Sequence, residues 1–212
     1  MAKISNVNVY GLAESIFRSG YPMLTMPPDE SKFEETTSQI KHDIIVGRLD
    51  NNHIRRAIKL ANISGGGHDQ FLTGIVVNFD LMISNKAWVE AERYTFLNFI
   101  SSMSTMHRIS EIPISECCNT YTSVDTVRRV EKLQAEYQMA DDNMKPEAYL
   151  TLLYNLPSGF ELTAGMTTNY RCLKNIYAQR RGHRLPDWSM FCDWIETLPL
   201  ASFLITGGAT TR

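Results

Sequence analysis

The stretch TTNYRCLKNIYAQRRGHRLP, residues 167–186, places polar side chains on the apolar side of a helix. Its apolar periodicity predicts a helix over about 168–181. Asn169 and Arg180 are eleven positions apart, which is three turns plus about 20°, so both are expected to point toward the core. Because a buried guanidinium without a partner is costly, Arg180 must be held by something.

Two kinds of partner fit Arg180. A structural carboxylate would form an inward salt bridge with it. The guanidinium fork equally suits the phosphate, carboxylate or uracil-like base edge of a ligand. Arg171 and Asn175 lie on the opposite face of the same helix, where they are solvated in a monomer. If this helix packs between subunits, the same two residues are expected to reach a second site.

The rest of the chain is predicted to be mainly helical, with a small sheet. Apolar periodicity and capping residues predict helices over 35–48, 50–64, 86–106, 123–140, 146–157 and 187–199. Strict alternation of apolar and polar residues predicts a strand within 71–83, and weaker strand patterns occur at 5–10 and 159–167. Residues 22–34, with three prolines, are expected to form a loop, and 109–121 to be irregular.

These elements predict an α+β fold, with helices packed around a small and mostly antiparallel sheet. With 212 residues, 43% of them apolar and 21% charged, the chain has the composition of a globular protein, and we expect a single domain over 1–212. The net charge of -2 does not favour a nucleic acid polymer or an anionic membrane as partner.

Other sequence features exclude several classes of protein. No apolar run approaches the roughly 20 residues of a membrane span, and the N-terminal stretch lacks the apolar centre of a signal peptide. The four cysteines form no CxxC pair and the five histidines show no metal-ligand spacing. We therefore expect reduced thiols, no metal site and a cytoplasmic location.

Two further stretches carry candidate ligand contacts. In SGGGHDQF, residues 64–71, the glycine run would let the backbone approach a ligand near His68, or it is a flexible turn with a surface histidine. In SSMSTMHR, residues 101–108, hydroxyl groups with His107 and Arg108 could surround a phosphate. Equally, this stretch is a polar helix end whose basic residues complement the helix dipole.

Taken together, the three stretches resemble the flavin-dependent thymidylate synthases. That family has a Leu-Pro pair and, twelve residues after the proline, Asn-x-Arg-x-x-x-Asn-x-x-x-x-Arg in one helix. Here Leu156-Pro157 is followed at the same spacing by Asn169, Arg171, Asn175 and Arg180. The family also has a Gly-His-acid sequence before an apolar strand, which matches GHDQFLTGIVVNF at 67–79. The resemblance covers roughly residues 54 to 195.

The resemblance implies a homotetramer in which each FAD is held between subunits. It implies transfer of a one-carbon unit, by methylation or hydroxymethylation, from methylenetetrahydrofolate to C5 of a pyrimidine deoxynucleotide monophosphate such as dUMP. Reduced flavin supplies the hydride and NADPH reduces the flavin. By position, Arg180 contacts the nucleotide, Asn169 and Asn175 line the flavin or nucleotide, and His68 lies beside the flavin. Arg171 is placed for contact with a second subunit.

The family signature, Arg-His-Arg, two residues, Ser-x-Asn-Glu-x-Ser-x-Arg, has no intact copy in this chain. Counting without gaps from His68 places Arg93 on the first signature arginine, a flavin contact. The stretch SSMSTMHR, which contains Ser104 and Arg108, then takes the place of the substrate-binding half, with an insertion of roughly three residues. Matching by letters instead places MHRI on Arg-His-Arg, so that His107 and Arg108 become the flavin contacts. We favour the first register.

The signature's Asn-Glu pair is missing in either register, and a family arginine four residues before the Leu-Pro proline is Leu153 here. Two alternatives therefore stand beside the enzyme. One is a non-catalytic relative that binds a nucleotide or a partner protein. The other is a helical interaction module in which Arg180 belongs to a structural ion pair.

Overall fold

The computed structural model describes residues 2–63 and 67–207 of the chain. In this part, four strands form one antiparallel sheet of order β1-β2-β4-β3. The strands are β1 (Lys3–Tyr10), β2 (Val76–Ser84), β3 (Asn98–Ser102) and β4 (Glu161–Asn169). The helices are α1 (Leu12–Arg18), α2 (Glu30–Ile45), α3 (Asn52–Ala61), α4 (Asn85–Ala91), α5 (Thr105–Arg108), α6 (Val124–Met139), α7 (Lys145–Tyr154), α8 (Tyr170–Arg180), α9 (Pro186–Glu196) and α10 (Ala201–Leu204).

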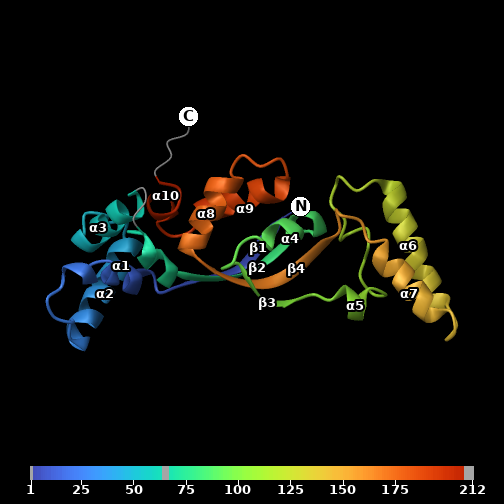
Figure 1. Cartoon of the computed structure of the whole chain (residues 1–212), viewed down its shortest axis with the longest axis horizontal. Helices are drawn as coiled ribbons and strands as arrows, with labels where there is room; N and C mark the ends of the chain where they lie inside the picture. Colours follow the sequence, from blue (N-terminus) through green and yellow to red (C-terminus); the bar gives the residue numbers. More distant parts are fainter. Residues whose placement is uncertain (1, 64–66, 208–212) are drawn as a thin grey trace.

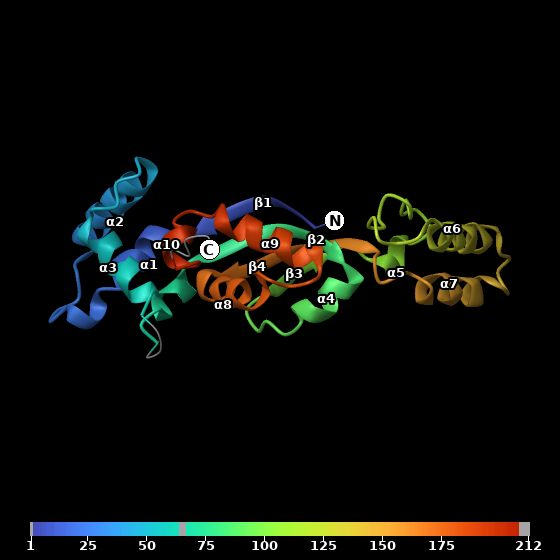
Figure 2. The same cartoon turned by 90° about the horizontal axis from the view of Figure 1, so that it is seen from above.

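The molecule is elongated, with the sheet at its centre (Figure 1). Helices α4, α8 and α9 lie over one face of the sheet, while α1, α2, α3 and α10 gather at one end and the α6–α7 hairpin stands at the other (Figures 1 and 2). Among the described residues, no helix covers the opposite face of the sheet (Figure 1). None of the helices described has the length and apolar character of a membrane span.

The alternation in β2 explains which sheet face carries the helices. Val77, Phe79 and Leu81 are buried, whereas the residues between them are only half-buried. Successive side chains of a strand point to opposite faces, so the apolar set is directed at α8 and α9. Pairing of β2 with β4 runs without interruption from Val76 opposite Asn169 to Ser84 opposite Glu161.

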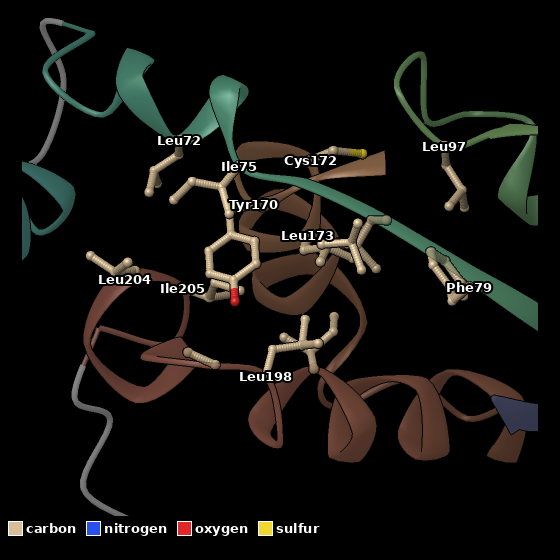
Figure 3. Close-up of a cluster of buried hydrophobic side chains, with 14 of the residues drawn as sticks. Leu72, Ile75, Phe79, Leu97, Tyr170, Cys172, Leu173, Leu198, Leu204 and Ile205 are labelled. Atoms are coloured by element: carbon tan, nitrogen blue, oxygen red, sulfur yellow. The ribbon is translucent and has the colours of Figure 1, made fainter. Parts of the chain in front are cut away.

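The main core lies between the sheet and the helices that follow β4. Tyr170, the first residue of α8, is fully buried in a cluster with Leu72, Ile75 and Leu204 (Figure 3). Its hydroxyl donates a hydrogen bond to the Pro199 carbonyl, 2.8 Å away, which satisfies the one polar atom of the ring. This contact fixes the start of α8 against the turn between α9 and α10.

A second, smaller core belongs to the α6–α7 hairpin. It consists of the buried residues Ile109, Ile112, Ile114, Val130, Leu152 and Phe160. The segment 109–121 carries three of them and has no helix or long strand, as predicted. The prediction of a single domain over 1–212 stays a prediction.

The α+β class and the antiparallel sheet agree with the sequence analysis, and the three predicted strands correspond to β1, β2 and β4. The predicted helix over 86–106 is wrong beyond Ala91. There the chain turns, enters β3 and then forms the short α5. All five residues of β3 are exposed, so the strand lacks the alternation that marks a half-buried strand, and pairing with β4 stabilises it instead.

Two other boundaries differ from prediction. The expected loop over 22–34 is wrong from Glu30, where α2 begins, because the Asp29 side chain caps the helix by accepting a hydrogen bond from the backbone N–H of Lys32 at 2.7 Å. Asn169 is not inside the helix that holds Arg180. It is the last residue of β4, and α8 begins at Tyr170.

Candidate functional site

A pocket of about 290 Å³ lies between the segment that follows α4 and one side of α8. We call it the α8 pocket. Its lining residues are Thr73, Arg93, Tyr94, Thr95, Phe96, Asn169, Arg171, Cys172, Asn175 and Gln179. Four predicted site residues, Arg93, Asn169, Arg171 and Asn175, therefore line one pocket although they come from two distant parts of the sequence.

Asn169 occupies the junction between β4 and α8. Its carboxamide oxygen accepts a hydrogen bond from the backbone N–H of Cys172 at 2.9 Å and so caps the helix. The cap satisfies one of the N–H groups that a helix leaves free at its start. With the oxygen engaged in this way, the amide NH₂ group is the part of Asn169 that can donate to a ligand.

Arg171 ties the segment after His68 to α8. Its Nη1 donates to Oε1 of Gln70 at 2.7 Å, and its Nε lies 3.3 Å from Oδ1 of Asp69. Lys174, one turn further along α8, lies 3.0 Å from the other oxygen of Asp69. Arg171 and Lys174 of α8 thus both pair with Asp69. These contacts join the Gly-His-Asp stretch to the helix that carries Arg171 and Asn175.

His68 lies on the other side of this segment, in a separate pocket of about 830 Å³ that also has Tyr21, Lys59 and Phe71 in its wall. We call it the His68 pocket. Gln70 lines it while accepting the hydrogen bond from Arg171, which lines the α8 pocket. The chain around Gln70 is therefore the wall between the two pockets. Of the glycine run before His68, residues 65 and 66 lie outside the described residues.

Arg180 is buried and does not belong to the described lining of either pocket. Its Nη1 donates to Oε2 of Glu90 at 2.7 Å, and its Nε donates to the Tyr94 hydroxyl at 2.7 Å. The guanidinium carbon lies 4.7 Å from the centre of the Trp188 ring. Within one chain, the structural carboxylate is thus the partner of Arg180, and its contact with a nucleotide stays a prediction.

Arg180 nevertheless acts on the α8 pocket through Tyr94. The Tyr94 hydroxyl accepts from Arg180 and donates to Oε1 of Gln179 at 3.2 Å. Tyr94 and Gln179 both line the α8 pocket. The buried ion pair therefore fixes two side chains of the pocket wall.

Glu90 is held in its ionised form by several donors. The indole N–H of Trp188 donates to its Oε2 at 3.0 Å, while His183 lies 3.4 Å from this oxygen and Lys86 lies 3.7 Å from Oε1. Burial by itself raises the pKa of Glu90. The hydrogen bond from Trp188 and the charges of His183, Arg180 and Lys86 outweigh burial, so the pKa lies below its ordinary value of 4.5.

Ser104 and Arg108 are not brought to the α8 pocket in the single chain. The Ser104 hydroxyl lies 2.8 Å from Nδ1 of His107, and Arg108 forms an exposed pair with Glu111 at 3.0 Å. These residues belong to the region of α5, which lies toward the α6–α7 hairpin and away from α8 (Figure 1). The structure thus separates the Arg93 part of the expected site from the Ser104 part.

The sequence analysis missed Tyr94, Phe96 and Gln179 as lining residues. Tyr94 and Phe96 flank Arg93 closely, and Gln179 lies four residues after Asn175 on the same helical face, so a scan of neighbours would have found them. Cys172 also lines the pocket, but burial raises the pKa of its thiol. No cluster of three or more metal-ligating side chains occurs in the described part of the chain.

Comparison with known proteins gives a likeness of fold. No family model and no curated protein sequence matches the chain. Among solved structures, it is similar to the flavin-dependent thymidylate synthase ThyX from Helicobacter pylori complexed with FAD and dUMP, at a TM-score of 0.67 and 14% identity over 96% of this chain and 97% of that one. Another structure of that Helicobacter pylori enzyme with FAD and dUMP gives a TM-score of 0.64 and 16% identity over 97% of both chains. The chain therefore has the fold of these enzymes.

Replacement of Arg180 by alanine should lower the free energy of unfolding by about 2–4 kcal/mol, because it removes the partner of a largely buried carboxylate. The matched control is Arg181→Ala, whose exposed pairs with Asp193 and Glu196 should contribute less than about 1 kcal/mol. Urea unfolding measures both. Equal losses in the two variants would show that the Arg180 pair is no stronger than a surface contact.

The same ion pair predicts a dependence on pH. Since the folded pKa of Glu90 lies below its unfolded value, the ionised carboxylate stabilises the fold above about pH 4.5, and this stabilisation disappears as the pH falls through the folded pKa. Glu90→Gln should therefore be less stable than the wild type at about pH 7, and the difference should shrink as the pH falls toward about 3. Thermal unfolding across this range checks it, and a constant difference would contradict it.

Proposed function

We propose that this chain is a flavin-dependent enzyme that transfers a one-carbon unit, by methylation or hydroxymethylation, to C5 of a pyrimidine deoxynucleotide monophosphate. FAD is the proposed cofactor, with NADPH and methylenetetrahydrofolate as co-substrates and the cytoplasm as its location. The family resemblance of the sequence supplies this chemistry. The solved structures of similar fold contain FAD and dUMP, which supports FAD as the cofactor and a pyrimidine nucleotide as the substrate.

One observation carries the proposal. The sequence resemblance selects Arg93 by counting from His68, and Asn169, Arg171 and Asn175 by the spacing along one helix. These two selections are independent of each other, and the fold places all four residues around one pocket. That two separate selections line the same pocket is the support for the register that assigns Arg93.

The lining of the α8 pocket fits part of a flavin dinucleotide. Arg93 offers a guanidinium group that suits a pyrophosphate, Asn175 and Gln179 offer amide groups, and Phe96 offers an exposed ring for a planar ring system. Bound FAD would supply the hydride for reduction of the transferred group. At about 290 Å³ the pocket lies at the lower limit of small-molecule sites, so the remaining contacts must come from elsewhere.

A homotetramer supplies those contacts in our proposal. The face of the sheet opposite α8 and α9 carries no helix of the described residues, which leaves it available to a second copy (Figure 1). The α8 pocket and the residues Ser104 and Arg108 are apart in one chain. Assembly would let Ser104 and Arg108 of one subunit bind the nucleotide beside the α8 pocket of another.

Arg180 would contact the nucleotide with one of the three N–H donors that its described partners leave free. Its Nε and Nη1 are engaged by Tyr94 and Glu90, and no described residue accepts a hydrogen bond from Nη2. A base edge that binds Nη2 would meet a guanidinium already oriented by two partners. Such preorganisation lowers the entropic cost of binding.

A non-catalytic relative that binds a nucleotide or a partner protein is the second candidate. The observation that favours it is the engagement of Arg180 by Glu90, together with the loss of the Asn-Glu pair of the signature. This candidate keeps the fold and the α8 pocket but lacks turnover. Only an assay of product formation distinguishes this non-catalytic relative from the enzyme.

Flavin binding distinguishes the two alignments of the family signature, one of which assigns the flavin contact to Arg93 and the other to His107 and Arg108. Arg93→Ala should lose about 10- to 150-fold in affinity for added FAD, the size expected for one charge-assisted contact, while His107→Ala keeps the wild-type affinity. Quenching of flavin fluorescence during titration measures both variants. If His107→Ala loses FAD and Arg93→Ala retains it, the letter-matched register is correct.

The function itself is tested on the purified protein with FAD, NADPH, methylenetetrahydrofolate and dUMP. We expect a yellow protein that forms a 5-substituted nucleotide, and a light-scattering mass about four times that of the 24.1 kDa chain. Bound FAD without product would favour the non-catalytic relative. A colourless monomer that takes up no flavin would contradict both the cofactor and the assembly.

A further inference from the structure

A third pocket, with a largely polar rim, lies outside the α8 and His68 pockets, where α4 and α9 begin. Its volume is about 620 Å³, and its walls come from the start of α4, the segment 119–126, the turn 157–159 and the segment 184–187. We call it the α4–α9 pocket. We propose that it binds a small organic phosphate, with Lys86 and Arg184 as the two cationic contacts. This inference does not depend on the proposed function.

The available charge in this pocket is positive. Lys86 and Arg184 line it, and Arg184 has no ion-pair partner among the residues the structure describes. The lining carboxylate, Asp187, is buried and already accepts hydrogen bonds from the backbone N–H and the hydroxyl of Ser84, at 3.0 and 3.3 Å. Lys86 lies 3.7 Å from Glu90, whose other oxygen is held by Arg180 and Trp188.

Hydroxyl groups surround the two cations. Thr122, Ser123, Thr126 and Ser158 all line the pocket. The Thr122 hydroxyl donates to Oδ1 of Asn119 at 3.3 Å, and the Ser123 and Thr126 hydroxyls share one hydrogen bond at 2.8 Å. Ser158 and one member of the Ser123–Thr126 pair are therefore the groups left to donate to a phosphate oxygen without adding charge. Ser123 also caps α6 by accepting from the backbone N–H of Thr126 at 3.2 Å, so the positive end of this helix dipole lies at the same wall.

Backbone hydrogen bonds hold the walls in place. The N–H of Lys86 donates to the Ser158 carbonyl at 3.0 Å, and the N–H of Asn119 donates to the Gly159 carbonyl at 2.9 Å. Gly159 is packed so closely that a Cβ atom there would lie 2.3 Å from the Thr122 hydroxyl oxygen. The pocket is therefore formed before any ligand enters, which lowers the cost of binding.

The size and the apolar part of the lining indicate an organic phosphate rather than a bare ion. A volume of about 620 Å³ is in the range of small-molecule sites and far exceeds the need of one phosphate group. Tyr121, Pro157, Leu185 and Pro186 provide an apolar wall beside the cations. This combination suits a phosphomonoester whose other end is a ring.

Titration calorimetry of the full-length protein tests the proposal with phenyl phosphate, inorganic phosphate and phenol. Phenyl phosphate should bind more tightly than inorganic phosphate, and phenol should not bind. Arg184→Gln and Lys86→Gln should each weaken phenyl phosphate binding at least about tenfold, the loss of one charge-assisted contact. The matched control is Lys132→Gln, on α6 outside the pocket, which should bind as the wild type does.

Arg93→Ala separates this site from the α8 pocket. It should leave phenyl phosphate binding unchanged, since Arg93 does not line the α4–α9 pocket. Loss of binding in Arg93→Ala, or equal weakening by Lys132→Gln, would overturn the assignment. So would the absence of heat from phenyl phosphate up to about 10 mM, a concentration that still detects millimolar affinity. Arg184 is exposed, so Arg184→Gln is expected to fold even where Lys86→Gln alters the contacts of Glu90.

Discussion

A buried guanidinium must have a partner, and much of this structure is arranged around the one that Arg180 finds. The pair with Glu90 joins the end of α8 to α4, and Trp188 of α9 closes the group from the other side. Desolvation of two charges is offset only when both are well hydrogen-bonded, as they are here. The segment after α4 is thereby held against α8, and the α8 pocket forms between them.

The junction between β4 and α8 is the second constraint. β4 pairs along its length with β2 and turns into α8 without a linker. Asn169 caps the helix at that point, so the direction of α8 over the sheet follows from the strand before it. One side of α8 is then buried against the core, while Arg171 and Asn175 on another side face the pocket. A single helix therefore serves both packing and binding.

The arrangement of the pockets bears on the chemistry. The chain around Gln70 divides the α8 pocket from the His68 pocket, and Arg171 fixes that dividing wall. A ligand as long as a dinucleotide has to extend beyond either pocket alone. The chain shares its fold with the two solved flavin-dependent thymidylate synthase structures at only 14–16% identity. The α4–α9 pocket is linked to Glu90 through Lys86, which lines the pocket and lies 3.7 Å from Oε1 of Glu90.

Local patterns determined part of this protein. The alternation of Val77, Phe79 and Leu81 predicts a strand and its buried face, because side-chain direction in a strand has a period of two. The helical spacing of Arg171 and Asn175 likewise predicts residues on one side of α8. Both features depend only on neighbours in sequence, so the sequence alone is sufficient to find them.

Tertiary structure decided the rest. β3 has no buried residue of its own and exists because β4 offers it hydrogen bonds. Glu90 as the partner of Arg180 was equally beyond the sequence, since many carboxylates could have served and only the packing of α4, α8 and α9 brings this one within 2.7 Å. Local periodicity fixes which way a side chain points along its own element, whereas its partner depends on how distant elements pack.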